Sequence, residues 1–209
     1  MLPKLLLLTL LWPAGAFAQT AQVDPMTLRA RDAHQNLTIL ADPYLSAERY
    51  DKARFGKKSP FEAGIVAINV YFRNDNDSAI RLNLNSIQLI VSTTDDTHQR
   101  LNVLTPQDVA DRTILDANAN PNARPRFPGS ANSGKSKAWI EMDDSIQAIA
   151  VSSDVLPPHA TTHGFVFFDM NHHWDAVRRS HLYIPDLIFM TDKKALFFFE
   201  VDLSVVPVS

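Results

Sequence analysis

The sequence contains no cysteine among its 209 residues. Disulfide bonds therefore cannot stabilise the fold, and a thiolate metal site or a cysteine nucleophile is excluded. The chain also offers no cysteine for a lipid anchor. Secreted eukaryotic domains often depend on disulfide bonds, so this composition favours a bacterial envelope protein.

Long apolar segments are also missing. The N-terminus has a basic residue, Lys4, then an apolar run over residues 5–12, then Ala16-Phe17-Ala18, which is typical of a signal-peptide cleavage site. The run is shorter than the roughly 20 residues that span a bilayer, and charged residues interrupt every later apolar stretch. We therefore expect a signal peptide over residues 1–18, export to the periplasm or the medium, and no stable membrane insertion.

The chain has no excess of basic residues. Lys and Arg number 20 against 23 Asp and Glu, which gives a net charge of −3. Such a chain has no overall field that would draw it onto nucleic acid, so we expect no nucleic-acid partner. No motif of the sequence gives reason to expect a cofactor.

What the sequence does have is alternation of apolar and polar residues from Asn36 onwards. The clearest case is residues 65–73, where Val66, Ile68, Val70 and Phe72 would share one face of a strand. We expect this face to be buried in one core together with four aromatic residues of the later strands: Phe165, Phe167, Phe197 and Phe199. Similar segments separated by polar turns predict further strands over 37–40, 80–84, 87–91, 100–104, 163–170, 182–190 and 195–203. This spacing predicts a mainly β fold, an immunoglobulin-like antiparallel β-sandwich.

Helical signals interrupt this pattern between about residues 105 and 150. Thr105-Pro106, with Asp108, is typical of a helix start, and residues 138–150 place their apolar side chains on one stripe. Residues 117–137 between them are rich in Asn, Pro, Gly and Ser, which predicts a long loop. We therefore expect one sandwich domain over 36–209 with a two-helix insertion, preceded by a poorly ordered segment over 19–35. A further short helix is expected after Asp42.

Two segments resemble a known group of proteins. The predicted strand that ends in Asn74, followed by Asp77-Ser78-Ala79-Ile80-Arg81-Leu82, is the first, and Leu156–Phe168 is the second, with Leu-Pro before the predicted strand and Gly-Phe-Val-Phe-Phe within it. Over about half of the mature chain they resemble exported bacterial immunoglobulin-like domains of the telokin-like and water-stress groups. The resemblance implies a binding or accessory role without catalytic residues. The chain departs from it at the insertion.

Residues 129–136 match the phosphate-binding pattern G-x-x-x-x-G-K-S at every fixed position. The chemistry requires the loop to leave a buried strand and enter a helix, so that backbone amides converge on the phosphate. Pro125 and Pro128 precede the motif and argue against such a strand. We therefore interpret the segment as a flexible linker.

Two groups of residues are candidates for function. The basic side chains of the long loop are predicted to bind an envelope protein or a polysaccharide, because long loops in compact domains are often functional: Arg124, Arg126, Lys135 and Lys137. The alternative is a metal-assisted hydrolase, which would need a second set to meet in space: His159, His163, Asp169 and His172 or His173. Since the sequence has no G-x-S-x-G motif of a serine hydrolase, the non-enzymatic binding domain is our leading hypothesis.

The export hypothesis predicts the N-terminus of the mature protein. When the full chain is expressed in a bacterium with a secretion pathway, cleavage after Ala18 should leave Gln19 as the first residue. Intact-mass measurement of the exported fraction tests this. A soluble cytoplasmic product that keeps residues 1–18 would contradict it.

Overall fold

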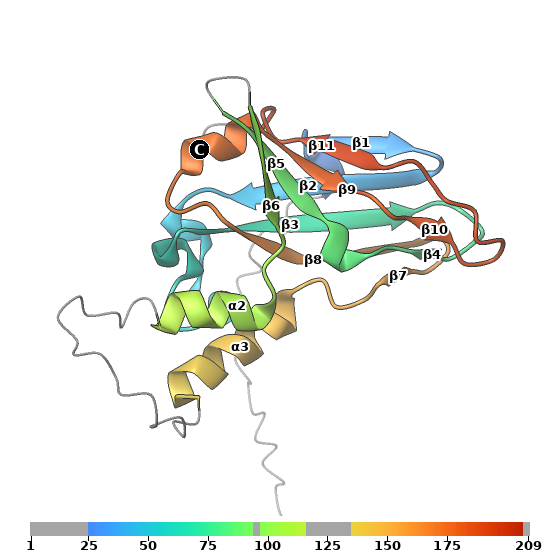
Figure 1. Ribbon diagram of the computed structural model, residues 1–209. Helices are drawn as coiled ribbons and strands as arrows, with labels where there is room; N and C mark the ends of the chain where they lie inside the picture. Colours follow the sequence, from blue (N-terminus) through green and yellow to red (C-terminus); the bar gives the residue numbers. More distant parts are fainter. Residues whose placement is uncertain (1–24, 94–96, 116–134, 207–209) are drawn as a thin grey trace, which may run out of the picture.

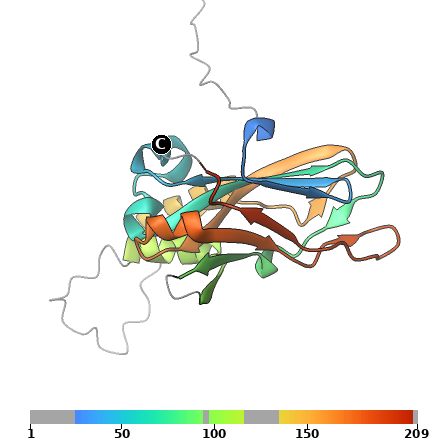
Figure 2. The ribbon, with the colours of Figure 1, turned by 90° about the horizontal axis from the view of Figure 1, so that it is seen from above.

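Two four-stranded antiparallel sheets face each other in the computed structural model, which describes residues 25–93, 97–115 and 135–206 (Figure 1). The first sheet has the order β1-β2-β3-β8, with β1 at Arg31–His34, β2 at Leu37–Tyr44, β3 at Ile65–Asn74 and β8 at Ala160–Asp169. The second has the order β11-β9-β5-β6, with β11 at Phe199–Asp202, β9 at Ser180–Ile184, β5 at Gln88–Ser92 and β6 at His98–Asn102. The view from above separates the two layers (Figure 2).

A third, short sheet lies at the right-hand end in Figure 1 and has the order β10-β4-β7. Its strands are β4 at Ile80–Arg81, β7 at Val155–Leu156 and β10 at Ile188–Phe189. In the large sheets, β2, β3 and β8 correspond in order to strands A, B and E of an immunoglobulin sandwich, and β5, β6, β9 and β11 to C, C′, F and G. The expectation of a mainly β sandwich is confirmed.

Strand β3 is the centre of the first sheet. All of its ten residues pair with β8, and eight of them pair with β2. Val66 and Ile68 lie opposite Phe168 and Val166, in the core between the two sheets. Ala67 lies opposite Phe167, in a second core on the outer face of the first sheet. The strand is therefore covered on both faces.

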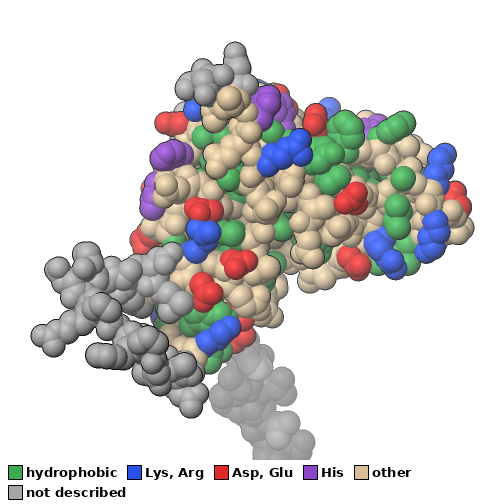
Figure 3. All heavy atoms as spheres, viewed as in Figure 1, with side chains coloured by type: hydrophobic (Ala, Val, Ile, Leu, Met, Phe, Trp, Pro, Cys, Tyr) green, Lys and Arg blue, Asp and Glu red, His purple; other side chains and the backbone are tan. Residues whose placement is uncertain are grey.

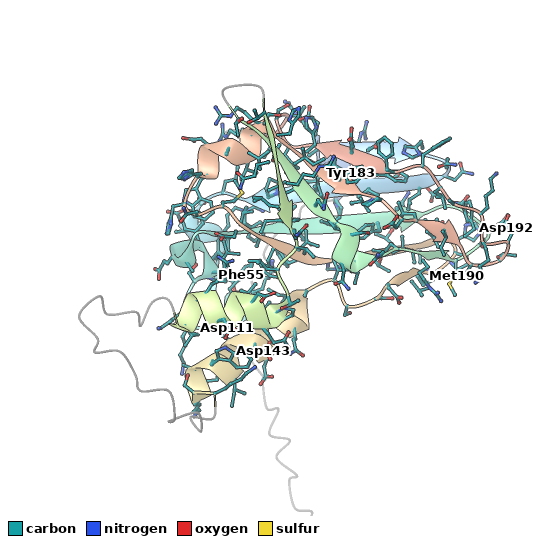
Figure 4. The ribbon with its side chains drawn as sticks, in the orientation of Figure 1. Phe55, Asp111, Asp143, Tyr183, Met190 and Asp192 are labelled. Carbon is teal, nitrogen blue, oxygen red and sulfur yellow. The ribbon has the colours of Figure 1, made fainter. Side chains whose placement is uncertain are left out.

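A helical layer covers that outer face, below β3 and β8 in Figure 1. It consists of α1 at Lys52–Phe55, α2 at Pro106–Ala110 with a π-helical turn, η5, at Asp111–Leu115, and α3 at Lys137–Ile149. Trp139, Met142 and Ile146 of α3 are buried, as the stripe predicts, and the Trp139 Nε1 donates to Asp111 at 2.6 Å. Figure 4 shows Phe55, Asp111 and Asp143 at this layer, far from Met190 and Asp192.

Side-chain caps set where these helices begin. The Thr105 hydroxyl accepts from the Asp108 backbone N–H, and the Asp108 carboxylate accepts from the Thr105 backbone N–H, which is a capping box. Hydrogen bonds from the Thr105 hydroxyl and its backbone N–H lower the pKa of Asp108. Ser136 caps α3 in the same way, accepting from the Trp139 N–H at 3.2 Å. Short 3₁₀ turns complete the fold: η1 at Pro25–Thr27, η2 at Ala47–Arg49, η3 at Pro60–Ala63, η4 at Leu84–Ser86 and η7 at Trp174–Arg179.

The N-terminal part differs from the sequence-based expectation. Residues 31–34, expected to be poorly ordered, form β1, which pairs with β2 through a turn at Gln35 and Asn36, both with left-handed φ. The helix expected after Asp42 is wrong, because β2 continues through Pro43 to Tyr44. Proline is tolerated there because β1 pairs with β2 only as far as Leu40, so no strand on that side requires its N–H.

The aromatic side chains also differ from expectation. Phe165 and Phe167 were expected to share a core with Val66 and its alternates, but the register of β3 and β8 puts them on the opposite face. Phe197, also expected in the core, is 73% exposed, because β11 begins only at Phe199. Within the described residues no helix is long and apolar enough to cross a membrane.

Asn74 joins the end of β3 to two turns. Its side chain is fully buried, and Nδ2 lies 3.0 Å from the Ser78 carbonyl, 3.2 Å from that of Leu156 and 3.0 Å from that of Pro157. Its Oδ1 accepts from the Asn76 backbone N–H at 3.1 Å. This one side chain therefore bonds both the β3–β4 turn and the start of the β7–β8 turn.

The second core predicts a large effect for Phe167→Ala. Phe167 is 1% exposed, so the truncation should reduce the free energy of unfolding by about 3–5 kcal/mol. Phe197→Ala is the control, since it removes the same atoms from an exposed site and should change stability by less than about 0.5 kcal/mol. Urea denaturation of both variants is the measurement. Equal losses in the two would contradict this assignment of the cores.

Asn74→Asp keeps the shape of the side chain and removes its donors. An ionised carboxylate would then face the carbonyls of Ser78, Leu156 and Pro157, which should reduce the free energy of unfolding by about 3 kcal/mol or more at neutral pH. The surrounding carbonyls would raise the folded-state pKa of this carboxyl above its usual value, and protonation restores a donor. The deficit should therefore narrow as the pH falls towards about 4 and should not change further below that pH. Asn85→Asp, at an exposed position, is the control and should show neither effect. A deficit that does not depend on pH would argue against this bonding.

Candidate functional site

A groove of about 580 Å³ runs along one side of the sandwich, where edge strand β6 of the second sheet faces edge strand β8 of the first. One wall consists of β6 and the end of β5, and residues 99–102 of β6 all border the groove. The other wall consists of the end of β8 with residues 169–171, η7, and Arg112 of the turn after α2. Successive residues of a strand point to opposite faces, so it is the edge of β6 that borders the groove.

An ion pair crosses the base of this groove. Arg112 donates from Nη1 to the Asp169 carboxylate, and both side chains are partly exposed. The capping box holds the start of α2, and the Leu104 N–H donates to the Phe167 carbonyl at 2.8 Å, which ties that start to β8. Two contacts therefore hold the turn that carries Arg112 beside Asp169. They are the capping box of Thr105 and Asp108 and the hydrogen bond from Leu104 to Phe167.

The loop after β8 shapes the opposite wall. Asn171 and His172 both have left-handed φ, and the Asn171 N–H donates to Asp169 Oδ1 at 2.9 Å. His172 Nε2 lies 3.1 Å from the Glu62 carbonyl, and a Cβ on Gly64 would lie 2.9 Å from the His172 backbone nitrogen. Gly64 itself has a left-handed φ of 78°, so glycine is required there on two grounds.

A second hollow of about 450 Å³ adjoins the groove and shares Arg112, Asp169 and Asn171 with it. Lys58 and His172 line its far side. It is also lined by Thr113, which is 3% exposed and whose Oγ1 is buried without a hydrogen-bond partner in the structure.

The charge of the groove is opposite in sign to that of the chain. Arg100 of β6, Arg112 and Arg179 of η7 line it together with His173, and among the described residues of the lining Asp169 is the one acidic side chain. The whole chain has a net charge of −3. Over the face that carries β5 and β6, acidic, basic and hydrophobic side chains are otherwise interspersed (Figure 3). A hollow in which one sign of charge predominates concentrates the field, and the described lining of this one, with three arginines and one aspartate, favours anionic groups.

Of the residues predicted from the loop, Lys135 and Lys137 do not line this groove. Arg124 and Arg126 lie outside the described residues. The Lys135 Nζ lies 3.3 Å from the centre of the Trp139 ring, and Lys137 pairs with Glu141 at 3.7 Å, one helical turn further along α3. The helix expected after the G-x-x-x-x-G-K-S motif is confirmed as α3, while residues 129–134 of the motif lie outside the described residues.

The histidines of the alternative hypothesis are spread along β8, with His159 before it, His163 within it, and His172 and His173 after it. The β3–β8 register places Ala160 opposite Asn74 and Asp169 opposite Ile65, so His159 and Asp169 are separated by the whole ten-residue strand β8. At about 3.4 Å per residue this is about 30 Å. His159 instead lies 2.8 Å from Asp77. In the described parts of the chain, no group of three His, Asp or Glu side chains is arranged to hold a metal ion. The structure therefore does not bring this set together.

No family model matches the chain, and no curated protein does. Among solved structures, the chain is similar to a functionally unknown protein from Listeria monocytogenes EGD-e, with 12% sequence identity and a TM-score of 0.34. That similarity covers 75% of this chain and 70% of the other.

Proposed function

We propose that this chain is a non-enzymatic exported domain that binds an anionic envelope component, protein or polysaccharide, in the groove between β6 and the β8–η7 loop. The observation that carries the proposal is that Arg100, Arg112 and Arg179 all border this groove. They come from a strand, a helical turn and a 3₁₀ helix that are distant in the sequence, and they line one hollow. Guanidinium groups are suited to this role because each presents five donors in a planar fork.

A binding role accounts for the arrangement better than hydrolysis does. A metal-assisted hydrolase would need His159, His163, Asp169 and His172 or His173 to meet, and the length of β8 separates His159 from Asp169. The groove needs no such constellation, since charge and hydrogen bonding are sufficient to hold a ligand. Loops and edges carried on a rigid sandwich are a common location for binding sites.

The exposure of the arginines sets the expected strength of binding. The Arg112 side chain is 41% exposed, so water and salt screen its interaction with a ligand. We expect affinity to depend strongly on ionic strength and association to be fast. A domain of this kind would bind anionic envelope components transiently and would not form a permanent complex with one partner.

Charge substitutions with a matched control test the groove. The triple variant Arg100→Ser, Arg112→Ser, Arg179→Ser should weaken binding of polyglutamate or of an oligogalacturonate by at least about tenfold in about 0.05 M salt. The control Lys135→Ser, Lys137→Ser, Lys194→Ser changes the net charge equally at exposed positions outside the groove and should change affinity by less than about twofold. Calorimetric titration of both variants and of the unaltered protein is the measurement.

The control also tests the loop predicted from the sequence. If the lysine variant loses binding and the arginine variant does not, the site lies at the cations near α3 and the groove assignment is wrong. If neither anionic polymer binds the unaltered protein, the anionic class of ligand is wrong.

A further inference from the structure

Strand β6 is an edge with unused pairing capacity. Among the described strands it pairs with β5 alone, and it ends the order β11-β9-β5-β6. An edge strand presents backbone N–H and C=O groups to whatever lies beside it, and the space beside β6 is the groove. Which residues of β6 supply those groups follows from the alternation of hydrogen bonds across the sheet.

The β5–β6 turn shows which residues of β6 bond to β5 and which face outward. The Thr93 N–H donates to the Thr97 carbonyl at 2.9 Å, in the register that continues as Ser92 opposite His98 and Val91 opposite Gln99. Residues of an antiparallel pair alternate between bonding inward to the partner strand and pointing outward. Gln99 and Leu101 therefore bond to β5, and His98, Arg100 and Asn102 direct their N–H and C=O groups away from it.

The hydrogen bonds on the β11 side of the sheet assign the same residues of β6 to the outward edge. The Leu203 N–H donates to the Ser180 carbonyl at 3.1 Å, so Ser180 and its alternates on β9 bond towards β11. His181 then bonds to Ile90 on β5, which leaves Leu89 and Val91 to bond to β6. The two ends of the sheet thus agree that the outward groups of β6 belong to residues 98, 100 and 102.

We propose that the groove binds an extended acidic peptide, which adds to β6 as a further strand and sets its carboxylates against the arginines. This inference rests on the proposed function and names the ligand that the groove would bind. The five residues of β6 give an edge of about 17 Å, enough to pair with about five residues of a peptide. Alternate side chains of the peptide would face Leu101 and Met170, which line the groove, and the others would face Arg100 and Arg179.

Charge argues for this occupant over a second copy of the chain. If two copies paired their β6 strands antiparallel about Arg100, the two Arg100 side chains would lie directly opposite each other, which is destabilising. Acidic side chains at the same positions would be attracted. An acidic polysaccharide could use the arginines, but it has no regular series of amide donors and carbonyls to match residues 98, 100 and 102.

The test uses the whole mature protein and a peptide of about eight residues in which Glu alternates with Val or Thr. The same peptide with every backbone amide N-methylated keeps the charge and loses the donors. We expect the first peptide to bind at least about tenfold more tightly than the second. At saturation, amide exchange of Arg100 and Asn102 should slow by at least about tenfold, while that of Gln99 and Leu101 stays unchanged.

A pair of variants at one position tests the edge from the protein side. Asn102→Pro removes an outward N–H without breaking a backbone bond to β5, and it should weaken peptide binding by at least about tenfold. Asn102→Ser keeps that N–H and should bind within about twofold of the unaltered protein. Both substitutions at this position lose the side-chain bond from Gln88 Nε2 to Asn102 Oδ1, so the pair is matched in that respect. Thermal unfolding shows whether each variant is folded. If the proline variant is not, the N-methylated peptide and the exchange pattern still decide the question.

The outcomes separate strand addition from the proposed function. Equal affinity for both peptides and for an oligogalacturonate, all lost in the triple arginine variant, would overturn strand addition and leave an anion-binding groove. Binding of the unmodified peptide that survives the triple arginine variant, with the exchange pattern absent from β6, would overturn both.

Discussion

Strand β3 is apolar along most of its length and pairs on both edges, and this condition organises the molecule. Val66, Ile68 and Val70 require one cover, and Ile65 and Ala67 require another, because alternate side chains point to opposite faces. The second sheet supplies the first cover. The second cover comes from α1, α2 and α3, so the insertion that interrupts the strands is part of the core. Without it, Phe165 and Phe167 of β8 would be exposed as well.

The attachment of this helical layer also explains where the groove lies. The segment that carries α2 and α3 is bonded to β8 at both of its ends. Before α2, the Leu104 N–H donates to the Phe167 carbonyl, and after α3 the Val151 N–H donates to the Phe165 carbonyl at 3.1 Å. A Cβ on Gly164 would lie 2.7 Å from the Val151 nitrogen, so glycine permits this close approach. Both ties are to β8 and neither is to β6. The chain leaves the second sheet at β6 and crosses to the first, and the hollow lies between the two edges.

The sequence was sufficient for most strands of the two large sheets, for the start of α2 and for the buried stripe of α3, because each depends on residues close together in the chain. It was not sufficient where one residue pattern is compatible with two structures. Residues 165–168 are apolar on every position, so periodicity could not assign Phe167 or Phe168 to a face, and the register with β3 decides it. The groove was missed for a related reason. Arg100, Arg112 and Arg179 are single basic residues in unrelated segments, and only the fold brings them together. The sequence signal in the basic loop was stronger, and it pointed elsewhere.

The two ends of β8 contribute differently to the folded state. At one end Asn74 is fully buried and bonds to three carbonyls, so its hydrogen bonds are shielded from water and stabilise the fold. At the other end the pair of Arg112 and Asp169 is partly exposed, and such pairs contribute at most about 1 kcal/mol. Stability therefore does not account for the arginines of the groove. Because the fold depends so little on the Arg112–Asp169 pair, its charge can be altered while the sandwich stays intact, so the proposed binding can be tested at this end separately from folding.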